Sequence, residues 1–594
     1  MKFTALPGFL IFVSLYTSAQ VPPPSSKADS LNQANQRNID TLNSDTSKVV
    51  EILSAQRYGY SKKDSVNELL LLVGKVALKQ AGTIFYADSA VYNKNDRFVE
   101  AFKNVHINDR DSVHAYSDYL IYHTDTKVAF LKKKVRLTDG QSTLYTEELQ
   151  YDVTPKVGVY RNGGRVVNGT SVLTSDEGTY YADLKDFYFK DDVKLKDPQY
   201  YLESDSLLYN TNTEIATFIS DTYIEDSVKR TIRTKEGYYD LKNKNASFGQ
   251  RPTIHDGSMI IIANNVDTDD RTGMSVLTGN AIFRDTAEGL TVRGNLITSN
   301  RATGSMVATQ RPVMVITQDK DSTFITADTL YSGRLSELPV VDTVQSDSSI
   351  AEIVDTSASG SNTDSVAKTI IVDSAAKQRV RTNDTLLIKT SPQKNPPVVT
   401  VTNDSADRFF RAYYNVRVFS DSLQAVCDSL FYSGKDSIFR LFNEPVVWSG
   451  ESQVTGDTIY MYTKNKKPHE LYVFENGLMV NKTGSNMYNQ IKGNRLFGYF
   501  KEGEIDNIRA KGNAESIYYA KDEEEKIIGI NKATSDIIDM RFKNKELNKV
   551  VFISAVTGTM LPFTQASEDD RRLRNFKWHE DRRPKSKFEL MSSD

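Results

Sequence analysis

Cysteine, tryptophan and long apolar runs are scarce in this sequence. Its 594 residues include 1 Cys and 2 Trp. Cys427 therefore has no partner for an internal disulfide, and the fold must be held together by packing. After the first 20 residues, no stretch approaches the roughly 20 apolar residues of a membrane-spanning helix. We therefore expect a mature chain that is soluble or peripherally attached.

The sequence also lacks an excess of either charge and any familiar catalytic motif. Lys and Arg number 74 and Asp and Glu number 77, so no basic stripe suggests nucleic-acid binding. The 6 histidines lack zinc-protease spacing, and there is no nucleophile elbow, phosphate-binding glycine loop or paired-cysteine zinc motif. We expect the neighbouring His106, His114 and His123 to be exposed strand residues rather than metal ligands. The sequence predicts a protein that is not an enzyme and that holds no metal or cofactor.

The first residues have the features of a secretory signal peptide. Lys2 is followed by a mostly apolar stretch, and small residues precede a predicted cleavage site between Ala19 and Gln20. Residues 1–19 are therefore predicted to be removed on export. Residues 20–65 are polar and rich in Pro, Ser, Asn and Asp, which predicts a flexible leader.

Residues 66–334 repeat with a period of about 29 residues. A six-residue block has Ser or Thr first, an acid second, an apolar residue fourth and Tyr sixth, and it is clearest at 117–122, 146–151 and 204–209. Blocks start at residues 87, 117, 146, 175, 204 and 234, and weaker copies start at 263, 293 and 327. Such regular spacing is typical of a solenoid or another stacked array.

Each block is followed by a second stretch in which apolar and polar residues alternate, as in 99–107 and 186–195. Asp-Gly and Asn-Gly pairs such as 139–140 and 162–163 separate these stretches. Alternation of period two with frequent turns predicts short strands and little helix. The fold class is therefore all-β.

The acid at the second position of the block has two consequences. Residues such as Asp118, Asp176 and Asp205 form a ladder, but the glycine-rich loops of calcium-binding β-rolls are missing. We therefore expect the acids to accept hydrogen bonds from backbone amides at turns or strand starts. In an unbroken strand, Asp205 would share a face with Leu207 and Tyr209, and a bulge or corner after the acid would separate them.

The array is interrupted once. Residues 335–404 are rich in Ser, Thr, Asp and Val and predict a low-complexity, disordered linker or insertion. The strand pattern resumes over 405–560, and a highly charged tail, 561–594, ends the array.

Apolar side chains of stacked repeats are expected to share one interior. Two interpretations remain open, a closed core and a groove partly open to the acyl chains of an amphiphile, which would be free to slide from rung to rung. Burying acyl carbon in such a groove gains ~0.8 kcal/mol per CH₂. The predicted lining residues are Leu120, Tyr122, Val135, Leu137, Leu149, Tyr151, Val193, Leu195, Leu207, Tyr209, Leu430 and Tyr432.

The repeat resembles that of the OstA-like, or LptA-like, lipopolysaccharide-transport family. The similarity is carried by blocks such as 87–92 and 327–331 and by glycine-containing companions at 72–78 and 277–283. It covers about 68–333 well and 409–559 more loosely. The resemblance implies an extended, twisted β-jellyroll, or β-taco, whose apolar interior holds the acyl chains of lipid A. The lining would then fall on the residues named above.

The resemblance also implies a function. It suggests a periplasmic bridge or carrier, in the periplasm or peripheral to the outer membrane, that helps to deliver lipopolysaccharide or a related lipid to the outer membrane. Expected partners are that lipid, other lipopolysaccharide-transport proteins at the inner and outer membranes, and further copies of the chain joined end to end. The first alternative is a β-solenoid scaffold or adhesin with a closed core and no bound lipid. A polysaccharide-processing β-helix would need carboxylates clustered at one rung, which the sequence does not show.

Overall fold

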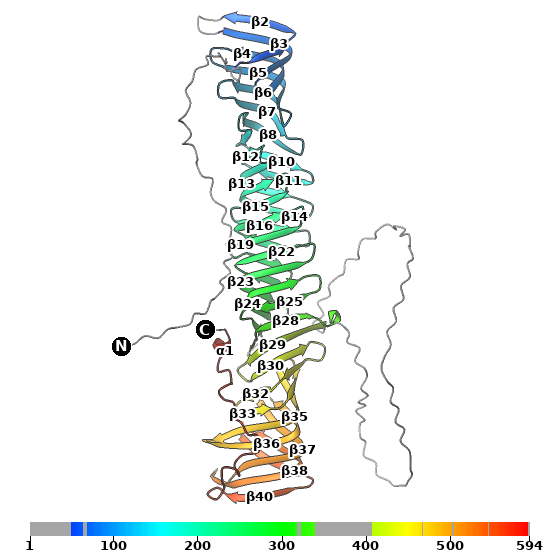
Figure 1. The fold of residues 1–594 in the computed structure, drawn as a ribbon, viewed down its shortest axis with the longest axis vertical. Helices are drawn as coiled ribbons and strands as arrows, with labels where there is room; N and C mark the ends of the chain where they lie inside the picture. Colours follow the sequence, from blue (N-terminus) through cyan, green and yellow to red (C-terminus); the bar gives the residue numbers. More distant parts are fainter. Residues whose placement is uncertain are drawn as a thin grey trace, which may run out of the picture.

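A computed structural model of the chain describes residues 49–62, 68–317, 322–338, 407–465, 467–501, 504–524, 526–543 and 546–591. The predicted signal peptide with its cleavage site at Ala19 and Gln20, most of the leader and most of the 335–404 insertion lie outside these residues. Within them, antiparallel strands stack in chain order into one elongated β-structure (Figure 1). The fold class is therefore all-β, as the alternating pattern predicts.

Each pass of the chain crosses two sheets that meet at a corner, which we call arm A and arm B. The strands that run through the corner are β3 (Glu68–Gln80), β4 (Thr83–Asn93), β5 (Phe98–Asp109), β6 (Val113–His123), β7 (Val128–Thr138), β8 (Ser142–Asp152), β13 (Asp186–Lys196), β14 (Tyr200–Asn210), β23 (Met274–Asp285), β24 (Leu290–Asn300), β29 (Arg408–Phe419), β30 (Gln424–Ser433), β35 (Lys467–Gly484), β36 (Met487–Lys501), β37 (Glu504–Lys521) and β38 (Ile527–Lys543).

Other strands lie in one arm only. Arm A contains β2 (Arg57–Lys62), β9 (Val157–Tyr160), β12 (Glu177–Tyr181), β15 (Ile215–Phe218), β18 (Glu236–Asp240), β19 (Asn245–Gly249), β22 (Asn265–Asp269), β25 (Ser305–Thr309), β28 (Thr329–Arg334), β31 (Ile438–Phe442), β34 (Thr458–Lys464) and β39 (Glu546–Ile553). Arm B contains β1 (Glu51–Ser54), β10 (Gly164–Asn168), β11 (Ser171–Ser175), β16 (Thr222–Asp226), β17 (Thr231–Thr234), β20 (Thr253–Asp256), β21 (Met259–Ile262), β26 (Val313–Ile316), β27 (Thr323–Thr326), β32 (Val446–Ser449), β33 (Ser452–Thr455) and β40 (Thr557–Pro562). A short 3₁₀ helix, η2 (Leu335–Glu337), follows β28, and one helix, α1 (Lys587–Met591), lies near the C-terminus.

The corner is a bulge opposite the acid of the repeat. Lys190 pairs with Ser206 and Val193 with Ser204, so that Asp191 and Asp192 together face the single Asp205. Both bulge residues have positive φ, 61° and 47°, which Asp tolerates better than most residues. The corner reverses the alternation, so Asp205 is exposed while Leu207 and Tyr209 are buried. The predicted separation of the acid from the apolar face is confirmed.

The hydroxyl of the repeat, and not its acid, serves the backbone at this corner. The side chains of Ser117, Ser175 and Ser204 donate to the carbonyl oxygen two residues ahead, over 2.9, 2.6 and 3.0 Å. The acids instead contact side chains on the neighbouring rung, as in the 2.9 Å hydrogen bond from Asn104 to Asp88. The expectation that the acids bind backbone amides was wrong, because the inward-facing hydroxyl lies closer to the bent backbone.

The strand array is longer and more continuous than the sequence suggests. It begins with β1 and β2, inside the predicted leader, because both strands pair with β3. β28 and β27 pair directly with β29, so the ladder crosses the site of the insertion without a break. The two predicted segments, 66–334 and 405–560, therefore form one stack.

The charged tail folds back along the outside of the stack. Residues 563–591, here called the strap, run from β40 back to α1, which contacts β27 and β29 (Figure 1). Leu573, Phe576 and Trp578 pack against the outer face of arm B, where Val480 and Ile517 are fully buried. The strap thus covers apolar surface that the distal strands would otherwise expose.

Two buried glutamines on this face hold the strap by its backbone. The Gln490 amide donates to the carbonyl of Arg571 and accepts from the amide of Leu573, both over 2.8 Å. Gln453 does the same for Lys577 and His579, over 2.8 and 2.7 Å. Both glutamines are 0% exposed. The two glutamines face outward from strands that are separated by one strand, β35. Each gives the strap backbone one donor and one acceptor, as the backbone of a neighbouring strand would.

We predict that Gln453→Leu loosens the strap. The substitution leaves one part-buried amide and one part-buried carbonyl of the strap without their hydrogen-bond partner, which costs up to about 1–3 kcal/mol for each group. Hydrogen exchange of the peptide around His579 should then become at least about tenfold faster, because about 1.4 kcal/mol corresponds to a factor of ten.

The control is Gln199→Leu, at an exposed glutamine that makes no side-chain hydrogen bond in the described part of the chain. Unchanged exchange in the Gln453 variant would show that the glutamine does not hold the strap.

Candidate functional site

One row of inward-facing residues runs along arm A, close to the edge opposite the corner. We call this edge of the V-shaped stack the open edge, the sheet margins that border it the rims, and each pass of the chain through the two arms a rung. The members of the row are joined by strand register and are here called the clasp row. In order they are Tyr122, Ala129, Tyr151, Gly158, Tyr180, Phe187, Tyr209, Ala216, Tyr239, Ala246, Thr268, Ser275, Ser299, Met306, Ser332, Phe410, Tyr432, Phe439 and Met461. The sixth residues of the blocks that start at residues 117, 146, 175, 204 and 234 belong to this row.

In the N-terminal half, tyrosines of the clasp row close the open edge. The Tyr122 hydroxyl donates to Gln80 over 2.6 Å, and Gln80 donates to the Thr124 carbonyl over 2.8 Å. Tyr151 donates to Asp109 over 2.8 Å. In each case a ring from arm A reaches a polar group at the turn of arm B, so the two sheets are joined at their rims as well as at the corner.

The next two rungs repeat this closure. Tyr180 donates to Asp139 over 2.6 Å, and Lys185 donates to the same carboxylate over 2.8 Å. The amide of Asn168 donates to the Tyr209 hydroxyl over 3.0 Å. Small residues such as Gly158 alternate with the tyrosines and leave room for their rings. The apolar side chains inside these rungs are almost fully buried.

A buried charged cluster ends the closed region. Arg230 donates to Asp226 and Asp270, each over 3.0 Å. Tyr200 and Tyr239 donate to the other oxygen of Asp270, over 2.8 and 2.9 Å. Burial disfavours the negative charge of Asp270, but Arg230 and the two tyrosine hydroxyls keep the pKa of Asp270 below its ordinary value. The cluster ties the two rims together at its rung.

Beyond this cluster the clasp row has no tyrosine until Tyr432. Thr268, Ser299 and Ser332 stand where Tyr209 and Tyr239 stand in the preceding rungs. A serine side chain is too short to span the gap between the rims, so the edge stays open. Here the interior contains a cavity of about 1550 Å³, which we call the chamber.

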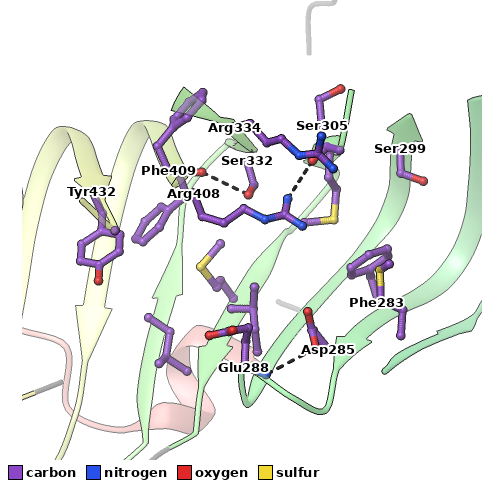
Figure 2. Close-up of a pocket in the computed structure, with 18 of the residues that line it drawn as sticks. Phe283, Asp285, Glu288, Ser299, Ser305, Ser332, Arg334, Arg408, Phe409 and Tyr432 are labelled. Carbon is purple, nitrogen blue, oxygen red and sulfur yellow. Dashed lines mark hydrogen bonds between the residues drawn. The ribbon is translucent and has the colours of Figure 1, made fainter. Parts of the chain in front are cut away.

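The chamber is apolar inside and charged at its mouth. Its walls include Ile261, Met306, Met314, Phe410 and Leu441. Figure 2 shows Arg334 and Arg408 along one rim, Asp285 and Glu288 along the opposite rim, and Ser299 and Ser332 near the first. Its volume exceeds the roughly 300–1,000 Å³ of a pocket for a drug-sized ligand. This arrangement suits a large amphiphile.

The residues predicted to line a groove fall into two groups. Only Leu430 and Tyr432 line the chamber. The remaining members lie in the closed rungs, each at most 2% exposed, with the tyrosines in the rim contacts described above. These are Leu120, Tyr122, Val135, Leu137, Leu149, Tyr151, Val193, Leu195, Leu207 and Tyr209. A lipid contact at any of the twelve positions stays a prediction.

Sequence reasoning missed the chamber because it followed the strongest repeats. One wall of the chamber is built from the weaker copies, starting near residues 263, 293 and 327, in which Thr or Ser replaces the Tyr of the block. The loss of tyrosine at one position in three successive repeats was the signal. Its meaning depends on knowing that this position faces the opposite rim.

Other candidate chemistry is limited in the described part of the chain. His106 and His114 are hydrogen-bonded to each other over 3.1 Å, and His123 packs beside Phe98 and Phe130. Among the described residues, no group of three or more His, Cys, Asp or Glu side chains is arranged to hold a metal. The helices within those residues are too short to span a bilayer.

We predict that the rim contact at Asp139 makes stability depend on pH. Burial of this carboxylate opposes its charge, but hydrogen bonds from Lys185, Tyr180 and two backbone amides lower its pKa to about 2. Because the folded pKa lies below the unfolded value of about 3.9, the carboxylate contributes about 2 kcal/mol above pH 4. This contribution is lost as the pH falls from about 4 to about 2.

Asp139→Asn should therefore lower stability at neutral pH, and its difference from the unmodified chain should vanish near pH 2. Chemical unfolding followed by circular dichroism at several pH values measures this difference. Asp205→Asn, at an exposed corner, is the control and should match the unmodified chain throughout. A difference for Asp139→Asn that does not depend on pH would contradict the assignment.

Comparison with known proteins agrees with the fold. Residues 47–205 match the model of a family described as OstA-like protein. No curated protein matches the chain. The match begins just before β1 and ends within β14, so it covers the first closed rungs and stops before the chamber. The matched residues are therefore similar to the OstA-like family, and the same stacked all-β architecture continues beyond them.

Proposed function

We propose that this chain is a periplasmic lipid carrier that holds the acyl part of lipopolysaccharide, or of a related lipid, in the chamber and helps to deliver it to the outer membrane. The observation that carries the proposal is a 1550 Å³ apolar cavity that opens at the edge of an OstA-like β-structure. The family match supports a transport or binding role rather than catalysis.

Acyl chains fit the chemistry of the chamber wall. Methionine, leucine, isoleucine and phenylalanine side chains supply apolar contacts without directional bonds, so chains of different length and branching are tolerated. Each buried CH₂ contributes ~0.8 kcal/mol, and several chains together would give a tight complex. The open mouth lets the polar headgroup stay in water.

The closed rungs favour a second role within the same proposal. Their interior side chains are buried and their rims are joined, as expected for the scaffold alternative. We assign them the role of a rigid spacer that holds the chamber at a fixed distance from the N-terminal end. At both ends the last strands, β1 and β2 on one side and β39 and β40 on the other, leave one edge without a described partner. These edges can accept another β-structure, either a transport partner or a second copy.

We predict that placing tyrosines at the mouth of the chamber prevents lipid from binding in it. Ser299→Tyr combined with Ser332→Tyr fills the mouth with the side chains that close the preceding rungs. Because losing contact with even two CH₂ groups costs about 1.6 kcal/mol, bound lipid should fall at least about tenfold. The measurement is mass spectrometry of lipid extracted from the purified mature protein.

The matched control is Ser247→Tyr, on the outward face of arm A opposite Tyr238. It adds the same side chain to the same sheet and should leave bound lipid unchanged. Equal lipid in the double variant and the unmodified chain would remove the chamber as the binding site.

We also predict that lipid crosslinking is confined to the chamber. A photoreactive residue in place of Leu290, which lines the chamber, should crosslink to acyl chains. The same residue in place of Leu207, 0% exposed in a closed rung, should not. Efficient crosslinking at Leu207 would show that the rims open and that lipid occupies the whole length of the structure.

A further inference from the structure

The two lips of the chamber carry opposite charge. On the arm A side, Arg301 follows β24, Arg334 ends β28 and Arg408 begins β29, and all three line the cavity. Arg408 donates to the Gly304 carbonyl over 2.9 Å, which keeps its side chain along the rim (Figure 2). We call these three arginines the basic lip. Asp285 and Glu288 stand across the mouth on the arm B side (Figure 2).

Of the carboxylates near the basic lip, Asp407 and Asp269 accept hydrogen bonds from other residues, and Glu337 also lines the cavity. Asp407 accepts hydrogen bonds from the amide and the hydroxyl of Ser336, over 3.0 and 2.7 Å. Asp269 accepts from Arg271, over 3.3 Å. Within the described residues, neither Arg301 nor Arg334 makes an ion pair. Two guanidinium groups therefore remain available at the edge of an apolar cavity.

The acidic lip is built differently. Asp285 accepts hydrogen bonds from the Ser258 hydroxyl over 2.9 Å and from the Ala287 amide over 3.0 Å, so it holds its own turn together. A negative group in the mouth would be repelled from this side and attracted to the other. A ligand with an anionic head is thereby oriented, with its charge against arm A and its chains in the interior.

We propose that the basic lip binds a phosphate group on the head of the amphiphile whose acyl chains occupy the chamber. The inference rests on the proposed function, because it requires a ligand in that cavity. A guanidinium group matches phosphate by donating two parallel hydrogen bonds, which a single lysine cannot do. Arg301 and Arg334, from consecutive rungs, supply two such groups, and Arg408 supplies a third partly held by the backbone.

The test compares two soluble amphiphiles with the same single acyl chain, lysophosphatidic acid and monoacylglycerol. Binding to the full mature chain is measured by titration calorimetry at low and at high salt. The unmodified protein should bind the phosphorylated probe at least about tenfold more tightly, because a hydrogen bond to a charged group is worth about one such factor or more. The preference should shrink at high salt, because the lip is partly exposed.

Arg301→Gln and Arg334→Gln should each weaken lysophosphatidic acid binding by about that factor and leave monoacylglycerol binding unchanged. Arg301 is exposed and makes no ion pair among the described residues, so we expect its variant to fold. The matched control is Arg293→Gln, exposed on the outward face of β24, which should change neither affinity.

The outcomes separate the two proposals. Equal affinity of the unmodified chain for both probes, or equal weakening of both by the lip variants, overturns the phosphate site and leaves the chamber as a lipid site. Failure of the unmodified chain to bind either probe overturns the proposed function, and the phosphate site with it.

Discussion

The whole structure depends on what fills the gap between two sheets that meet at only one edge. A V-shaped stack buries its corner easily, but its open edge exposes apolar side chains to water unless the rims are bridged. Tyrosine bridges them because it has a large ring for the interior and a hydroxyl at its far end for the opposite rim. Tyr122, Tyr151 and Tyr180 all do this. Where Ser299 and Ser332 replace tyrosine, nothing spans the gap and the interior opens.

This difference confines the proposed lipid site to one part of the molecule. In a trough open along its whole length, lipid would slide from rung to rung. Here a lipid in the chamber meets Arg230 and Asp270 at the N-terminal side, a buried ion pair supported by two tyrosine hydroxyls. Breaking one partner of such a buried pair costs about 3–5 kcal/mol. Passage into the closed rungs would require this rupture and then one opened clasp after another, so exchange through the lateral mouth is the easier route.

The fold was predictable from the sequence because its signals are local. Alternation reports which side chains share a face, and a 29-residue period reports that rungs stack. The corner was anticipated from the conflict between Asp205 and its apolar neighbours, and the register confirms it. The chamber and the strap were not predictable, because they depend on distant pairs. Tyr151 and Asp109 are 42 residues apart, and Gln453 and Lys577 are 124 apart. No pattern within one repeat indicates which rim a tyrosine reaches, or that a charged tail will return to cover an apolar face.

The strap connects this unpredicted part of the fold with the chamber. Neighbouring residues of a strand point to opposite faces, so Arg417 lies outside arm B while Val418 lines the chamber. Arg417 forms an ion pair with Glu589 of α1, and Leu590 of the same helix is buried. The C-terminus therefore braces, from outside, the strand that forms the chamber wall. At Ser332 the clasp row has no tyrosine to contact the rim of arm B. Without other support, arm B would be free to move away from arm A at this rung. A brace on the outer face replaces the missing clasp without filling the interior, and this allows a stable rung to remain open.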